Sequence, residues 1–231
     1  MDVESEQAAA GRTPLIDSLV ADLVPVRPVR LARMYVLTLC AQLLFVATAA
    51  LFVGASSPAL AKTSAVFFGA LVALLAAGAF AAAVAAMRLS IPGRHVSDAY
   101  TLAVLCVPLL LSAAVVVAAL WGAEWTGFAA HVGGGMPCTT ETVKLAVPAW
   151  IVSLLLLRTL APLSPLRVGI LATVSASLLG AVVVQLSCAN GDAYHLAISH
   201  YLPVVVAGLA GGGVAGLLFR MGEARVSPGD G

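Results

Sequence analysis

The 231-residue chain has too little charge to cover the surface of a water-soluble protein. Hydrophobic residues make up 61% of it, charged residues make up 10%, and the mean hydropathy is +1.04. This composition predicts an all-α, polytopic membrane protein. A formal net charge of +1 excludes a globally basic nucleic-acid-binding protein, so we expect no direct nucleic-acid partner.

Residues 1–33 form the sizeable polar segment of the chain and contain one amphipathic pattern. Thr13 and Pro14 are typical of a helix start, and Pro25 ends the pattern. The apolar positions recur at helical spacing and are Leu15, Ile16, Leu19, Val20, Leu23 and Val24. A helix this short is marginal alone in water, so its apolar stripe needs a surface. The pattern favours a protein partner, with the inner membrane leaflet as the alternative.

Six apolar runs follow, each near the length of about 17–25 residues that a transmembrane helix needs. They are Met34–Val53, Val66–Met87, Tyr100–Trp121, Leu145–Leu163, Val168–Ser187 and Ile198–Phe219. Ala59–Leu60–Ala61 resembles a signal-peptidase site, but the first run is too long for a signal peptide and 33 residues precede it. We therefore predict a retained first span.

The distribution of basic residues predicts the orientation of these spans. With the N-terminus inside, ten of the twelve Lys and Arg residues fall on the inner side, and Lys62 and Lys144 fall on the outer side. The prediction is therefore N-in and C-in. It gives a cytoplasmic segment 1–33, a six-helix transmembrane domain 34–219 and a cytoplasmic tail 220–231.

The predicted spans contain almost no ionisable residue near their centres, which argues against an ion or proton path. Gln42 and Gln185 are expected to form interhelical hydrogen bonds, and Gly208, Gly212 and Gly216 to allow close helix packing. A small-molecule or ion transporter remains the alternative function. With no Ser/His/acid group, no paired carboxylates and no phosphate-binding loop, we expect no enzyme activity.

Two predicted outer segments carry thiols and histidines. One runs from Gly122 to Lys144 and the other from Cys188 to Ala197. Cys138 and Cys188 could form a structural disulfide, or they could act as a sensor that oxidants couple or thiophilic metals bind. The potential metal ligands are Cys138, Cys188, His131, His195 and His200. The sequence does not establish a cofactor. The ligand types of these residues suit a soft metal ion that binds transiently.

Several segments together resemble one family of membrane proteins. The matching segments are Leu15–Arg27, Arg88–Arg94, the isolated Cys138 and Cys188, His200–Pro203 and Gly216–Arg220. In order and placement along six spans, they resemble the NrsF-type family, the negative regulators of sigma F. The likeness runs from about residue 14 to residue 220.

This resemblance implies a function for both sides of the membrane. It implies a membrane-bound anti-sigma factor of the bacterial inner membrane, whose cytoplasmic N-terminus holds an extracytoplasmic-function (ECF) sigma factor. Leu15–Arg27 would contact the sigma factor, and Cys138 and Cys188 would sense a stress signal such as a heavy metal or an oxidant. The sequence leaves open which sigma factor binds, which signal acts and what the oligomeric state is.

Overall fold

The computed structural model describes residues 18, 21, 30–54, 65–122, 128–160, 162–190 and 193–224. The chain divides into two units, Met1–Met34 and Tyr35–Gly231. In the first unit, Ser18 and Ala21 are helical. The other described residues of this unit are 30–34, where the first long helix begins at Leu31. All six predicted partner-binding residues, Leu15 to Val24, lie outside the described residues.

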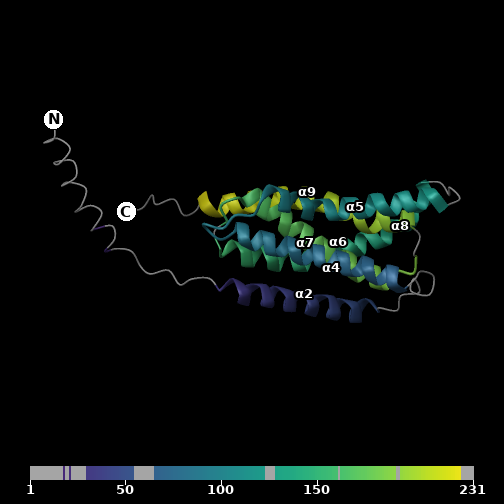
Figure 1. Cartoon of the computed structure of the whole chain (residues 1–231), viewed down its shortest axis with the longest axis horizontal. Helices are drawn as coiled ribbons and strands as arrows, with labels where there is room; N and C mark the ends of the chain where they lie inside the picture. The colour runs from purple at the N-terminus through teal and green to yellow at the C-terminus, as the bar shows by residue number, and fades with distance from the viewer. Residues whose placement is uncertain are drawn as a thin grey trace, which may run out of the picture. The chain divides into compact units, whose positions relative to one another are not determined.

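Every regular element in the described part of the chain is helical, as the sequence predicts. The helices are α2 (Leu31–Val53), α4 (Ala65–Leu89), α5 (Asp98–Gly122), α6 (Phe128–Arg158), α7 (Pro165–Ser187), α8 (Ala193–Leu196), the π-helix η1 (Ala197–Tyr201) and α9 (Leu202–Ala224). Figure 1 shows the long helices of the second unit running side by side. In the chain, α8 and η1 lead directly into α9.

Within the described residues, five helical segments are long and apolar enough to cross a membrane. They are Leu31–Val53, Phe68–Leu89, Pro137–Arg158, Pro165–Ser187 and Tyr194–Phe219. The remaining predicted span, Tyr100–Trp121, lies within α5, a helix of 25 residues, of which Asp98–Val107 counts as a shorter apolar helix. The multi-pass character therefore agrees with the prediction, while the count of six and the orientation stay predictions.

The prediction of a loop from Gly122 to Lys144 is wrong from Phe128 onward, because α6 already begins there. The charges of Glu141 and Lys144 had placed the start of the span at Leu145. These two residues lie one helical turn apart, pair at 2.8 Å between Nζ and Oε1, and remain exposed. An exposed pair at this spacing supports a helix, so α6 continues through these two residues, which lie near its middle.

The helix α7 is the centre of the second unit. In its apolar stretch, 94% of residues are buried, against 11% in α2. The helices α4, α6 and α9 pack around α7, and α2 reaches the group through a 3.2 Å hydrogen bond from the Gln42 amide to Ser175. The expected interhelical role of Gln42 is thus confirmed.

Glycines allow α7 and α9 to pack at close range, as predicted. A methyl carbon on Gly208 would lie 2.7 Å from Val174, and one on Gly212 would lie 2.8 Å from the Ile170 backbone. Gly216 faces Leu166, the third residue of this row on α7. A methyl group at Gly208 or Gly212 would require its neighbour on α7 to shift, so α7 and α9 form a closely packed pair.

One end of the helical group is held by polar contacts between helix termini. The Arg167 guanidinium pairs with the Asp98 carboxylate at 2.7 Å, and the Arg88 Nε donates to the Tyr35 hydroxyl at 2.8 Å. The turn after α4 includes Gly93, whose φ of +76° favours glycine. The candidate functional site lies at the opposite end of α7.

Candidate thiol and histidine site

Four potential ligand residues meet at the end of α7 away from Arg167. They are Cys138 on α6, Cys188 directly after α7, His195 on α8 and His200 on η1, and we call them the Cys–His cluster. One ligand atom from each residue lies within 4.8 Å of every other. The cluster therefore joins four of the five metal-ligand candidates that the sequence singled out. The fifth, His131, falls in α6, but its side chain lies outside the described part.

The two cysteines are close and free. Their Sγ atoms are 3.8 Å apart, and neither is in a disulfide. Cys188 is buried and Cys138 is half-buried. A disulfide needs an S–S distance of about 2.0 Å, so a small approach of α6 and the end of α7 would allow the bond to form. The geometry thus permits both alternatives that the sequence left open for this pair.

Cys40 and Cys106 do not join the cluster. Both are free, with Cys40 exposed on α2 and Cys106 partly buried on α5. In apolar helical stretches, thiols such as these behave as small hydrophobic groups. Neither belongs to the residues that form the cluster.

The histidines are positioned by a local change of helix type. His195 lies on α8 and His200 lies on η1, where the Leu202 N–H bonds to the Ala197 carbonyl five residues earlier. A π-turn of this kind inserts one extra residue into an α-helix and is frequent at functional sites. The insertion brings residues five apart to one face, so the two imidazole rings meet edge to face at 5.3 Å between centroids.

Hydrogen bonds connect the cluster to the helices around it. The Cys188 thiol lies 3.4 Å from Nε2 of His195, and Nδ1 of His200 lies 3.1 Å from Oε1 of Gln185. The Thr139 hydroxyl donates to the Ser199 carbonyl at 3.3 Å and so ties α6 to η1. The expected interhelical role of Gln185 is confirmed, and the structure identifies its partner as His200.

The sequence did not reveal the π-turn, nor the link between Thr139 and Ser199. A π-turn leaves no periodic signature in a uniformly apolar stretch, because hydrophobic residues occur on every face. A buried glutamine within a predicted span was the one available signal. It indicated a hydrogen bond, but the spacing alone could not name His200 as its partner.

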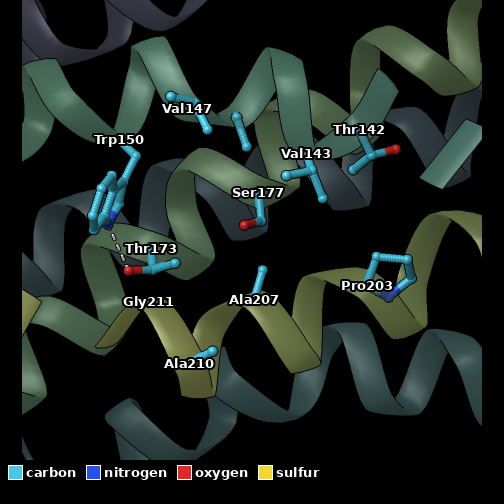
Figure 2. Close-up of a pocket in the computed structure, with 11 residues that line it drawn as sticks. Thr142, Val143, Val147, Trp150, Thr173, Ser177, Pro203, Ala207, Ala210 and Gly211 are labelled. Carbon is cyan, nitrogen blue, oxygen red and sulfur yellow. Dashed lines mark hydrogen bonds between the residues drawn. The ribbon is translucent and has the colours of Figure 1, made fainter. Parts of the chain in front are cut away.

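A narrow crevice lies beside the cluster between α6, α7 and α9. Its volume is about 210 Å³, and its lining is almost wholly apolar. Thr142 and Pro203 line one end, while the Trp150 indole N–H donates to the Thr173 hydroxyl at 2.8 Å at the other, as Figure 2 shows. None of the residues lining it is charged or a histidine. The crevice therefore offers no charged or imidazole ligand to a transported ion, and it separates α6 from α9 along part of their length.

Comparison with known protein families gives a match. A model of the family described as NrsF, negative regulator of sigma F, matches residues 19–221, which is most of the chain. No curated protein and no solved structure matches it. The matched region includes all four residues of the Cys–His cluster and all the described long helices except the last three residues of α9.

Proposed function

Since this chain belongs to the NrsF family of negative regulators of sigma F, we propose that it is a membrane-bound anti-sigma factor of the bacterial inner membrane. The observation that carries the proposal is the family match over residues 19–221. The five long apolar segments are compatible with its placement in a membrane. We propose that the chain is a regulatory protein and not an enzyme, and that its partner is an ECF-type sigma factor.

In this proposal, residues 1–33 hold the sigma factor at the cytoplasmic face. The apolar stripe from Leu15 to Val24 is too short to form a stable helix alone and would fold on its partner. Each fully buried aliphatic side chain contributes about 1.5–3 kcal/mol, so four or five anchors can offset the cost of ordering the segment. Held in this way, the sigma factor stays away from RNA polymerase.

The release signal is proposed to act at the other end of the transmembrane domain. The N-in orientation predicted from the basic residues would place Cys138 and Cys188 on the outer face. An oxidant that couples the thiols, or a thiophilic metal that binds them, would change how α6 and the end of α7 are held. A tenfold loss of sigma affinity needs about 1.4 kcal/mol of coupling between the two ends, which either event can supply.

Retention of the sigma factor by membranes tests the first half of this proposal. The full-length protein and the sigma factor encoded beside its gene are co-expressed, and the sigma factor is quantified in membrane and soluble fractions. We expect retention by the wild type and loss of retention with Leu19→Asp, which puts a charge on the apolar stripe. Ala21→Asp adds the same charge to the opposite face of the predicted helix and serves as the matched control.

Two outcomes would contradict the proposal. If the wild type leaves the sigma factor soluble, the chain is not its membrane anchor. If Leu19→Asp and Ala21→Asp retain it equally, the stripe is not the contact. The transporter alternative gains no support from the crevice, because no charged residue and no histidine lines it.

A further inference from the structure

We propose that the Cys–His cluster is a tetrahedral binding site for Zn²⁺, completed by His195 and His200. The inference deepens the proposed function by naming the ligand of the sensing end, and it rests on that function only for its regulatory meaning. Zinc binding itself follows from the geometry of the four residues. It can be measured whether or not a sigma factor binds.

The distances fit a tetrahedron of two sulfurs and two nitrogens. With Zn–S bonds of about 2.3 Å and Zn–N bonds of about 2.0–2.1 Å, a tetrahedral site has S–S edges of about 3.8 Å and S–N edges of about 3.6 Å. The Cys138–Cys188 sulfur distance is 3.8 Å, and the Cys188–His195 distance is 3.4 Å. No ligand atom is more than 4.8 Å from another, so small side-chain rotations would complete the set.

The environment of His200 also indicates a cation. Its side chain is fully buried, and its Nε2 has no hydrogen-bond partner among the residues that the structure describes. Because Oε1 of Gln185 can only accept, the 3.1 Å contact places the proton on Nδ1 and leaves the lone pair on Nε2. A ring held in one tautomer by an outer partner, with its other nitrogen free, is the usual arrangement of a metal-binding histidine.

The donor set determines the kind of ion. Two thiolates balance the charge of a divalent cation, and two neutral imidazoles add none, so the occupied site is neutral. A neutral site suits a place beside apolar helices, where an unbalanced charge would be costly. Thiolate and imidazole ligands favour Zn²⁺ over Mg²⁺ or Ca²⁺, which prefer oxygen.

A disulfide between the same cysteines is the competing interpretation, and it explains fewer observations. It would account for the closeness of Cys138 and Cys188 but would give the buried pair of histidines no role. It would also leave the orientation of the His200 ring by Gln185 unexplained. A four-ligand site accounts for the cysteines, the histidines and the π-turn together.

Cobalt binding to the full-length protein tests the site. The protein is purified in detergent, reduced and treated with a chelator, and Co²⁺ is then titrated as a spectroscopic probe. We expect one equivalent with the intense visible absorption of tetrahedral Co²⁺ and a sulfur-to-metal charge-transfer band, both abolished by Zn²⁺. Weak octahedral absorption, or no binding, would overturn the proposal.

Variants and a second measurement sharpen the test. Gln185→Leu should weaken the affinity about 10–100-fold, as loss of an outer partner typically does, and His200→Gln should weaken it further. His95→Gln removes an exposed histidine in the turn after α4 and is the matched control. Equal affinity of His200→Gln and His95→Gln would refute the assignment.

X-ray absorption of the zinc-loaded wild type needs no variant and should show two sulfur and two nitrogen ligands. A shell of oxygen and nitrogen without sulfur would refute the site. The sigma retention assay separates the two proposals. Retention without zinc binding removes the site alone, and zinc binding without retention removes the anti-sigma function alone.

Discussion

The packing of α6 on α7 can be tested at Gly180, close to the Cys–His cluster. A methyl carbon at this position would lie 2.5 Å from the carbonyl oxygen of Thr142, one helical turn from Cys138. Reaching an ordinary contact of 3.4 Å requires the two backbones to separate by about 0.9 Å, the difference between these distances. Gly180→Ala should therefore move the two cysteine sulfurs apart as well as destabilise the protein.

The expected magnitude follows from two opposing effects. Overpacking costs about 1–3 kcal/mol, and replacing glycine by alanine in a helix returns up to about 1 kcal/mol. A net loss of about 1–2 kcal/mol should lower the melting temperature of a chain of this size by about 2–8 °C. Thermal unfolding in detergent measures this loss, and the rate of disulfide formation with a diazene oxidant measures the separation of the thiols.

Gly213→Ala is the control, because a methyl group there would meet no atom within 4 Å. It should melt at or above the wild-type temperature and form the disulfide at the wild-type rate. Gly180→Ala should melt lower and form the disulfide more slowly. If the two variants behave alike in both assays, the close approach of α6 and α7 at Gly180 is refuted.

Three further predictions concern the cysteines and two polar contacts. The diazene oxidant should join Cys138 to Cys188, taking two electrons and two protons from the thiols. Alkylation followed by mass spectrometry should find this disulfide in a variant that retains only these two cysteines, and its absence would contradict the geometry. Trp150→Phe should cost about 0.5–1.5 kcal/mol in thermal unfolding, because the indole N–H loses its 2.8 Å hydrogen bond to α7; an unchanged melting temperature would argue against that bond. Arg167→Gln should change stability by less than about 1 kcal/mol, since its ion pair with Asp98 is exposed, and a larger loss in the same assay would show that the pair is structurally essential.

The sequence predicts the helical class well, because apolar runs near bilayer length have few alternatives. The sequence predicts the ends of a helix poorly where charged residues lie within that helix. Glu141 and Lys144 would be costly within a bilayer core, yet they lie exposed near the start of the apolar segment Pro137–Arg158, well inside the longer helix α6. A rule based on charge therefore began the fourth span at Leu145, although α6 begins at Phe128.

For the candidate site, too, the sequence predicts the residue types but not their arrangement. Residue chemistry identified Cys138, Cys188, His195 and His200 as potential ligands before any geometry was known. Their convergence depends on the π-turn, which arises from packing around η1 and has no sequence period of its own. Gln185 was identified by its polarity alone, and only its position on α7 shows that it orients His200.

The arrangement of helices indicates how an event at the Cys–His cluster could reach the far end of the protein. The described spans carry no chain of ionisable groups through their centres, so in the proposed function a signal would travel as a movement of helices. The helices α7 and α9 are fitted together by glycines and resist separation. The helix α6 carries Cys138, meets α7 at close range at Gly180, and faces α9 across an apolar crevice of about 210 Å³. In the proposed function, a change in the bond between Cys138 and the cluster would therefore shift α6 toward or away from α9, because the crevice leaves room on that side alone.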